Sequence, residues 1–443
     1  MAVYLICYGI SFILAWQHLY VLSGLVLVGA AIWLYIRDYI RTGNLIHLRG
    51  LFCLFFIGGQ GISCFKLSYL QTDWLLITWV SFFVAVMAFW WVFEVLTRMY
   101  DGWSASDMGS VYKYYSSADS PLQANRILIS MTVITLVSVS AFAFEAWRLD
   151  FVPMFSYGVP HAYSYFHIKG VHYFTVSCVL VPSLSVVYSL MMARRGRGLI
   201  RYKGFWLAVV CDIVAVMIPL LCVSRFQLIL AVGMAVFTYI SMTGSFSLIY
   251  VGVLLVALIP AYVALTVLRS HSVEYLNGIF EMKNSHMPIF ITQPYMYIAN
   301  NFDNFDCLVR DLSGFSFGKR MLFPFLSLTG LRFIFPKMVL TTVYLTSTEL
   351  TTLTMFYDAY YDFGVVGVFV FSLILGIVSK IVIDVIKKND NPIVYLFYGQ
   401  FAIYLMLAFF TTWFSSPATW FWLIVTGVIY WYVGFEGNGE KKR

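Results

Sequence analysis

Apolar runs about as long as a bilayer is thick recur along the whole sequence, and they constrain the fold more than any other feature. A membrane-crossing helix needs roughly 20 predominantly apolar residues. Only 11% of the 443 residues are charged, against about 25% in a soluble domain. We therefore predict a single all-α integral membrane domain, residues 1–443, with about twelve transmembrane helices. The expected runs are approximately 2–17, 19–36, 51–70, 74–96, 127–147, 171–192, 205–221, 227–243, 247–268, 364–385, 392–411 and 418–434.

The distribution of basic residues predicts the orientation, since Lys and Arg are enriched on the cytoplasmic side of membranes. With the N-terminus inside, the inner segments contain most of the 28 Lys and Arg residues, and the strongest marker is ARRGRGLIRYK, residues 193–203. Both termini are then cytoplasmic. The first residues lack the basic n-region of a signal peptide, so we expect an uncleaved first span.

Three segments face outward in this topology: 148–170, the turn at Ser224–Arg225, and the long stretch 269–363. A loop as long as 269–363 is usually functional. Its half-apolar, aromatic pieces predict short amphipathic helices that lie on the membrane surface.

Arg225 interrupts an apolar hairpin without an acidic neighbour, LLCVSRFQLILAV. One interpretation is that its side chain snorkels to outer lipid phosphates. The other is that Arg225 lines a cavity and binds an anion.

The outer segments concentrate further ionisable residues, among them Arg269, Asp303 and Arg310 in the long stretch. Guanidinium groups suit phosphate and pyrophosphate oxygens, but the same arginines also suit internal ion pairs or lipid headgroups. His161, His167 and His172 have spacings that do not match a metal pair. Each histidine is either a general base with a pKa near neutral or a polar loop residue.

The span that begins near residue 364 is preceded by a polar, aromatic cluster, TMFYDAYYDFG. Tyr360 and Tyr361 offer a ring and a hydroxyl that suit a sugar, and Asp362 follows them directly. An interfacial aromatic belt with a helix cap explains the same residues without a ligand.

These features together resemble the oligosaccharide repeat-unit polymerases of bacteria, the Wzy-type O-antigen, capsule and exopolysaccharide polymerases. The resemblance rests on the "SR" between two spans, on NNFDNF at 300–305, and on YYDFGVVGVFVFSLILG opening the next span. Its most specific element is Y-x-DFG-x-x-G, from Tyr360 to Gly367.

The resemblance implies a glycosyltransferase of the bacterial cytoplasmic membrane with an architecture like the O-antigen ligases and GT-C enzymes. Its donor is a growing glycan on undecaprenyl pyrophosphate, and its acceptor is one lipid-linked repeat unit on the outer face. The resemblance also implies that arginines on the outer side take part and that no metal or other cofactor is used. A flippase and a chain-length regulator are the implied partners in the bilayer.

The chemistry of that reaction suggests roles for the outer residues. We expect Arg225 to contact the pyrophosphate, with Arg269 or Arg310 assisting, because fixed cations stabilise a leaving group on which negative charge develops. His161, His167 or Asp362 is the expected base. Tyr360, Tyr361 and Asp303 are expected to bind the substrate.

Two other functions compete with polymerisation. An O-antigen-ligase-like glycan transferase shares the donor, but no histidine follows His286 in the long outer stretch, which disfavours it. A lipid-linked oligosaccharide flippase or another transporter is expected to carry charges inside its spans and repeated halves, and few spans here are charged. A nucleic-acid partner is not expected, since no basic face interleaved with aromatics is present.

Overall fold

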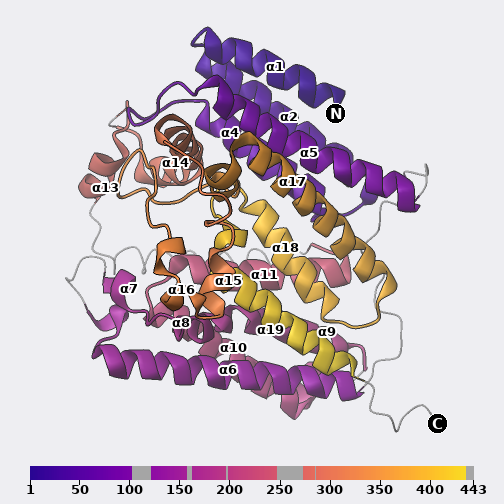
Figure 1. Ribbon diagram of the computed structural model, residues 1–443. Coiled ribbons are helices and arrows are strands. Elements are labelled where there is room, and N and C mark those ends of the chain that lie inside the picture. The colour runs from indigo at the N-terminus through magenta and orange to yellow at the C-terminus, as the bar shows by residue number, and fades with distance from the viewer. Residues whose placement is uncertain (102–120, 157–161, 196–197, 247–272, 285, 436–443) are drawn as a thin grey trace. The chain divides into compact units, whose positions relative to one another are not determined.

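The computed structural model describes residues 1–101, 121–156, 162–195, 198–246, 273–284 and 286–435, and within these ranges helices dominate and no β-strand forms (Figure 1). Seven described helices are long and apolar enough to cross a membrane, and three shorter apolar helices accompany them. The chain is therefore a polytopic helical membrane protein by length and composition of its helices.

Helices occupy each expected apolar run inside the described ranges, whereas the run 247–268 lies outside them. One boundary differs clearly from the prediction. The run expected over 51–70 is helical only to Ser63, and Lys66 then has a positive φ of 50°. The polar residues beyond Ser63 form hydrogen bonds to other elements, as described below, and this competes with continuation of the helix.

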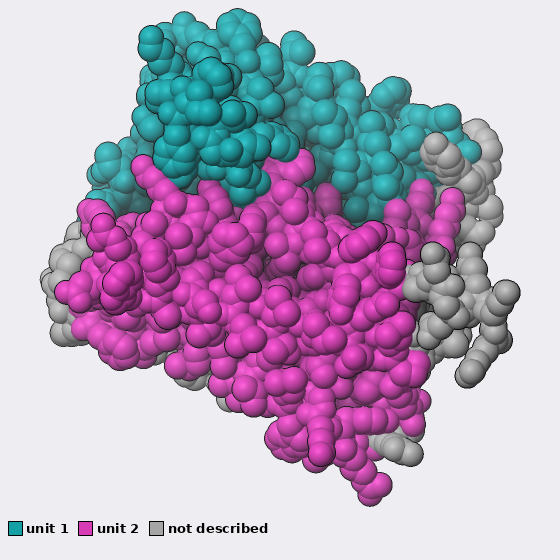
Figure 2. Space-filling model, turned by 60° about the horizontal axis from the view of Figure 1, so that its bottom comes forward, with its two compact units in different colours: residues 1–110, 272–383, 404–417 teal, residues 111–271, 384–403, 418–443 magenta. Residues whose placement is uncertain are grey.

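The chain divides into two compact units, coloured separately in Figure 2. Unit 1 comprises residues 1–110, 272–383 and 404–417, and unit 2 comprises 111–271, 384–403 and 418–443. The helices of unit 1 are α1 (Ala2–Trp16), α2 (Tyr20–Thr42), α3 (Leu48–Phe52), α4 (Gly58–Ser63), α5 (Leu76–Asp101), α13 (Val273–Phe280), α14 (Ile289–Asp311), α15 (Phe323–Leu328), α16 (Leu331–Ile334) and most of α17 (Tyr357–Lys388). Those of unit 2 are α6 (Pro121–Leu149), α7 (Ala162–Tyr165), α8 (His172–Thr175), α9 (Val181–Ala193), α10 (Lys203–Leu221), α11 (Arg225–Thr243), most of α18 (Val394–Met406) and nearly all of α19 (Pro417–Gly434).

Glycine allows a close helix contact in unit 1. A π-helical segment, Cys53–Ile57, joins α3 and α4 into one continuous buried helix, which packs on α2. A Cβ on Gly24 would lie 2.4 Å from the carbonyl oxygen of Gly61, and one on Gly61 would lie 2.8 Å from that of Gly24. Small residues drive helix association in membranes because they allow such backbone approach.

A buried ionic network lies near the C-terminal end of α5. The Arg49 guanidinium is fully buried and donates to both carboxylate oxygens of Asp38, at 2.6 and 2.7 Å, and to Glu94 at 2.9 Å. It also lies 4.3 Å from the centre of the Trp90 ring. Buried charges are retained only when they are paired in this way.

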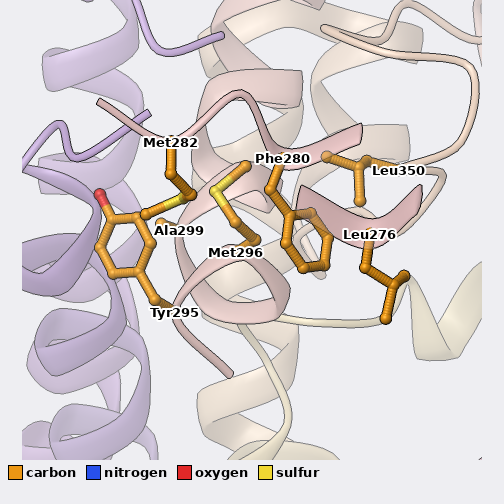
Figure 3. Packing of buried hydrophobic residues seen from close by; sticks show 7 residues of the cluster. All are labelled: Leu276, Phe280, Met282, Tyr295, Met296, Ala299 and Leu350. Carbon is orange, nitrogen blue, oxygen red and sulfur yellow. The ribbon is translucent and has the colours of Figure 1, made fainter. Parts of the chain in front are cut away.

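Helix α14 differs from what the sequence predicts for the stretch 269–363. It is a 23-residue helix, and both its apolar and its polar side chains are largely buried. With α13 and Leu350 it forms a hydrophobic cluster around Phe280 and Met296 (Figure 3). The sequence prediction of short surface helices did not anticipate α14. The polar residues of α14 suggested exposure to water, but they are paired inside the protein.

Unit 2 is built on four long helices, α6, α9, α10 and α11, which pack on one another. The start of α19 joins them through Phe421, whose ring lies 6.0 Å from Tyr173 and 5.0 Å from Phe174. Unit 2 thus brings the start of α19 to the 172–175 turn, next to the end of the outer segment predicted at 148–170.

Candidate functional site

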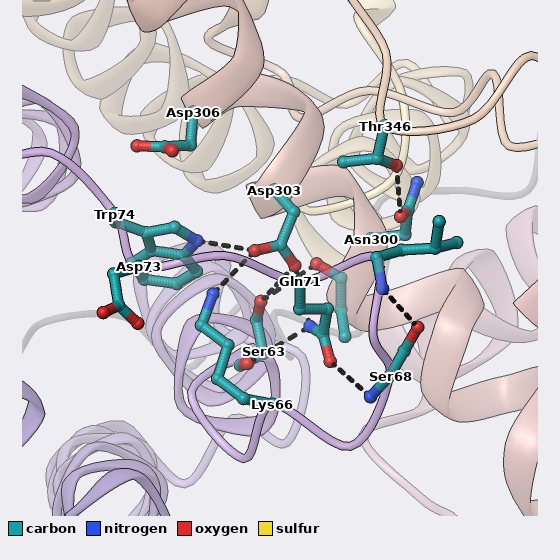
Figure 4. Close-up of polar contacts among 12 residues, drawn as sticks. Ser63, Lys66, Ser68, Gln71, Asp73, Trp74, Asn300, Asp303, Asp306 and Thr346 are labelled. Carbon is teal, nitrogen blue, oxygen red and sulfur yellow. Dashed lines mark hydrogen bonds and ion pairs between the residues drawn. The ribbon is translucent and has the colours of Figure 1, made fainter. Parts of the chain in front are cut away.

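Asp303 of α14 is the centre of a buried hydrogen-bond network in unit 1 (Figure 4). Its carboxylate accepts from Lys66 Nζ at 2.6 Å, from Trp74 Nε1 and Gln71 Nε2 at 2.7 Å each, and from Ser63 Oγ at 3.2 Å. These donors come from the last residue of α4 and from the segment that follows it. Four partners match the acceptor capacity of a carboxylate, so Asp303 fastens this segment to α14.

Asp306, one turn further along α14, holds the start of α5. It accepts from the backbone N–H of Leu75 at 2.8 Å and from Thr78 Oγ1 at 2.6 Å. A carboxylate near a helix N-terminus is favourable, since the first N–H groups lack partners. Asp306 also accepts from Arg310 Nε at 2.6 Å. Although burial acts to lower the pKa of Arg310, this hydrogen bond and ion pair raise it.

Two asparagines of NNFDNF, Asn300 and Asn304, bind the irregular segment that precedes α17. Asn304 donates to the carbonyl oxygens of Leu350 and Thr352 at 2.8 and 2.9 Å and accepts from the Thr346 N–H at 2.8 Å. Asn300 accepts from the Thr346 hydroxyl at 2.7 Å. Part of the motif that carries the resemblance thus has an internal role: it satisfies backbone groups of a segment without secondary structure.

Asp362 organises the turn at residues 316–321. It is fully buried and accepts from Ser316 Oγ, from the Met321 N–H at 2.8 Å and from the Arg320 N–H at 3.1 Å. The Phe317 N–H donates to the Asp362 carbonyl oxygen at 3.1 Å. The carboxylate predicted as a base therefore fixes the position of residues 320 and 321.

The glycines after Asp362 are required by a break in α17. Phe363 and Gly364 leave helical geometry, and Gly364 has φ 60° and ψ −146°, a conformation open almost only to glycine. At Gly367 a Cβ would lie 2.1 Å from the Ala359 carbonyl oxygen. The DFG-x-x-G pattern thus encodes a short helical turn, 357–362, folded closely against the membrane-spanning part of α17.

That short turn and the 316–321 turn bring together a cluster of aromatic and charged side chains, which we call the Arg320 cluster: Arg320, Tyr344, Asp358 and Tyr361. The guanidinium carbon of Arg320 lies 4.6 Å from the centre of the Tyr361 ring, and Nε lies 3.8 Å from Asp358 Oδ1. A terminal nitrogen of Arg320 donates to the Thr342 carbonyl oxygen. The Tyr344 and Tyr361 rings are 5.9 Å apart. The Arg320 cation thus lies over the Tyr361 ring, and the Tyr344 ring is tilted by 37° against Tyr361.

Two atoms of the Arg320 cluster have unused hydrogen-bonding capacity. Neither Nε of Arg320 nor Oδ1 of Asp358 has a hydrogen-bond partner within the described ranges, although both atoms are buried. Their separation of 3.8 Å is too long for a hydrogen bond. Buried polar atoms are normally satisfied, and exceptions are expected at functional sites. The cluster therefore has a donor and an acceptor that a ligand can engage.

Tyr360, predicted to bind sugar with Tyr361, packs differently from its neighbour. Its ring lies 5.1 Å from Phe305 and 6.5 Å from Phe315, and it is buried in unit 1. Tyr361 and Asp362 thus belong to the surroundings of Arg320, whereas Tyr360 joins the short turn of α17 to α14. The predicted roles of Asp303, Arg310, Tyr360 and Asp362 in substrate binding or catalysis stay predictions beside these internal contacts.

Arg225 lies in unit 2, at the first position of α11, and is only 7% exposed. The neighbouring Val223 and Leu228 pack with Met154 of the 148–170 segment. Val223 has a positive φ of 54°, which is strained for a β-branched residue. This burial favours an interaction of Arg225 inside the protein over a side chain that snorkels to lipid.

His167 also lies in unit 2, beside a buried glutamate. Its Nδ1 is 3.3 Å from Glu145, which also accepts from the Ile168 N–H at 2.9 Å and from Thr175 Oγ1 at 2.7 Å. The His167 and His172 rings are 5.8 Å apart. The carboxylate can orient the His167 ring, which suits the predicted base. The predicted His161 and Arg269 lie outside the described residues.

Arg320 is the functional candidate that the sequence did not single out. It is one of several arginines in the stretch 269–363, and 41 positions separate it from Tyr361. Only the break in α17 and the Asp362 hydrogen bonds bring the two together. The sequence offered one indirect signal, the carboxylate of Asp362 directly after Tyr360 and Tyr361 at the start of an apolar run.

No protein-family model matches the chain, and no curated protein and no solved structure matches it.

Proposed function

We propose that this protein is a membrane-embedded glycosyltransferase that joins lipid-linked oligosaccharide repeat units, with the Arg320 cluster as its site. The growing glycan would be transferred from undecaprenyl pyrophosphate to a second lipid-linked repeat unit. The resemblance described above suggests this class of reaction. The observation that carries the proposal is the cation of Arg320, stacked on Tyr361 and with Nε lacking a hydrogen-bond partner within the described ranges.

In this proposal, Arg320 stabilises the leaving group. Cleavage of the bond between the sugar and pyrophosphate leaves negative charge on the phosphate oxygens. A guanidinium fixed before the reaction stabilises that charge without reorganisation. Tyr361 and Asp362 hold Arg320 from two sides: Tyr361 through its ring, and Asp362 through the Arg320 backbone N–H. The Asp362 bond fixes the backbone of Arg320, and the Tyr361 ring and the Thr342 carbonyl oxygen restrain its side chain, as preorganisation requires.

Asp358 is the proposed base. Its Oδ1 lies 3.8 Å from Arg320 Nε and has no hydrogen-bond partner in the described part of the chain. In the proposed step the acceptor hydroxyl attacks the anomeric carbon, its proton passes to Asp358, and pyrophosphate leaves with the bonding electrons. The rings of Tyr344 and Tyr361 offer stacking surfaces for a sugar.

The two ends of α5 support a site at one membrane face. Leu76, beside Asp306 and α14, and Glu94, beside Arg49, are about 27 Å apart along the helix, close to the ~30 Å hydrocarbon thickness of a bilayer. Basic residues gather at the Arg49 end: Arg37, Arg41, Arg49 and Arg98. The enrichment of basic residues on the cytoplasmic side then assigns the Asp306 end, near the Arg320 cluster, to the outer face.

Reconstitution tests this function. The protein is purified in detergent and given one lipid-pyrophosphate-linked repeat unit from its host with EDTA present, and the products are separated on a gel. A ladder with one-unit steps is the expected result. Absence of any product above one unit, from folded protein and intact substrate, would contradict the proposal.

A flippase for the same lipid is a second function that one observation favours. Unit 1 holds ion pairs in buried positions, Arg49 with Asp38 and Lys66 with Asp303. Ionisable residues inside membrane proteins often mark transport paths. Movement of the lipid across a liposome membrane without any ladder would support transport, whereas a ladder from detergent-purified protein requires transferase activity.

A further inference from the structure

A groove follows α1 and α5 on unit 1, apart from the Arg320 cluster. It consists of two adjoining cavities of about 400 and 310 Å3. Phe12, Leu76 and Trp79 line both, so the two cavities lie next to each other along α1 and α5. Each is a feature of unit 1 alone.

The cavity toward the start of α1 is almost wholly apolar. Its walls include Leu5 and Tyr8 of α1 and Val80 and Phe83 of α5, with Gly9 between them. A Cβ on Gly9 would meet no atom within 4 Å. The missing side chain of Gly9 thus keeps the groove open, and the walls suit a hydrocarbon chain.

The other cavity ends in a polar mouth formed by His18, Tyr20, Lys66 and Asp73. The Tyr20 hydroxyl donates to Asp73 and lies 2.6 Å from His18 Nδ1. Lys66 Nζ lies 4.3 Å from the centre of the Trp74 ring, and its hydrogen bond to Asp303 uses one of the three N–H donors of an ammonium group. The mouth thus presents donors and a carboxylate together.

The dimensions of the groove fit one leaflet of a bilayer. The α1 residues that line it run from Leu5 to Trp16, which is about 16 Å along the helix. Half of the hydrocarbon core of a bilayer is about 15 Å thick. A lipid with its headgroup at the mouth would therefore reach the inner end of the groove with one chain.

Charge at the mouth selects among lipid headgroups. The charge of Lys66 is balanced by Asp303, whereas the Asp73 side chain is 62% exposed. A purely anionic headgroup such as a pyrophosphate would be repelled by Asp73. A zwitterionic headgroup brings an ammonium to Asp73 and a phosphate to Lys66, so both of its charges meet an opposite partner.

We propose that this groove binds one acyl chain of a phospholipid with an ammonium headgroup, such as phosphatidylethanolamine. The chain lies between α1 and α5 and the ammonium pairs with Asp73. This lipid would bind unit 1 from the outer leaflet as a structural partner. It is distinct from the glycan-bearing substrate of the proposed reaction, so the lipid site does not depend on the protein being a glycosyltransferase.

Native mass spectrometry of the detergent-purified full chain tests the proposal, with phosphatidylethanolamine, phosphatidylglycerol and undecaprenyl phosphate added as separate probes. Gly9→Leu adds a side chain whose Cβ meets no atom within 4 Å and whose remaining atoms occupy the groove. Its matched control is Gly29→Leu in α2, because a Cβ there also meets no atom within 4 Å and Gly29 does not line either cavity. Val80→Trp blocks the groove from the opposite wall should Gly9→Leu fail to fold.

We expect phosphatidylethanolamine to bind wild type and Gly29→Leu equally, and Gly9→Leu about tenfold more weakly, because the added side chain takes the place of the lipid chain. Asp73→Asn should reduce the preference for phosphatidylethanolamine over phosphatidylglycerol, at most about fivefold for an exposed ion pair. Equal binding to all variants would overturn the proposal, and so would a preference of wild type for either anionic lipid.

Discussion

The buried carboxylates of unit 1 differ in how completely they are paired. Asp303 has four donors and Asp362 has three, whereas Asp358 keeps an oxygen without a hydrogen bond within the described ranges. A fully bonded carboxylate loses its internal partners if it binds a ligand. Asp358 and Arg320 can form new hydrogen bonds with a ligand, so we propose that they carry the chemistry. Asp303 has its full set of internal partners, so its role is to stabilise the fold.

Asp303→Leu should destabilise the protein strongly. It leaves Lys66 buried and unpaired beside Trp74, and breaking a buried ion pair costs about 3–5 kcal/mol. Thermal unfolding in detergent measures the loss. The double variant Asp303→Leu/Lys66→Met should recover part of the loss. Glu349→Gln, at an exposed carboxylate, serves as the control with little change. A stable Asp303→Leu protein that makes no polymer would instead support the substrate-binding role predicted from the sequence.

At the scale of elements, the sequence predicts the apolar helices well and the polar ones poorly. Length and hydropathy locate α5, α6 and α9 because a membrane span has to bury its own backbone hydrogen bonds. The same criteria do not identify α14, since its buried polar residues pair with segments distant in the sequence: Asp303 with Lys66, 237 positions away, and Asn304 with Leu350, 46 positions away. The Arg320 cluster was not predictable for the same reason: its contacts are long-range and depend on the break at Gly364.

The break in α17 gives a prediction about an element. Gly367→Ala should destabilise the protein by about 1–3 kcal/mol, the usual cost of overpacking, because its Cβ would lie 2.1 Å from the Ala359 carbonyl oxygen. Thermal unfolding again provides the measurement. Gly427→Ala in α19 is the matched control, since a Cβ there meets nothing within 4 Å and alanine favours helix. Equal melting temperatures for the two variants would show that the close approach at Gly367 is not needed.

For the whole molecule, composition and apolar runs were sufficient to predict an all-helical membrane protein, and seven helices long enough to cross a membrane are present among the described residues. The predicted orientation rests on basic residues alone. In unit 1 it assigns Asp73 to the outside and Arg98 to the cytoplasm, two side chains at opposite ends of α5 that are 62% and 54% exposed.

Cysteine labelling in whole cells checks this orientation. Asp73→Cys should react with a membrane-impermeant maleimide, whereas Arg98→Cys should react only after permeabilisation. The native thiols give little background because they are buried or half-buried; burial and the nearby Asp303, Asp306 and Asp311 raise the pKa of the Cys307 thiol to about 11, which leaves little reactive thiolate. The reverse labelling pattern would invert the topology.

The central claim is that Arg320 stabilises the leaving group of a repeat-unit transfer, and the most direct test is the polymer ladder formed by Arg320→Ala in the reconstituted assay. Loss of one preorganised donor costs about 10²–10³-fold in rate. We predict a loss of this size for folded Arg320→Ala protein, with a lowered melting temperature because Asp358 loses its paired cation. Near-normal rates are expected for Lys319→Ala, which removes a cation one residue earlier in the same turn. A wild-type ladder from folded Arg320→Ala protein would contradict the account.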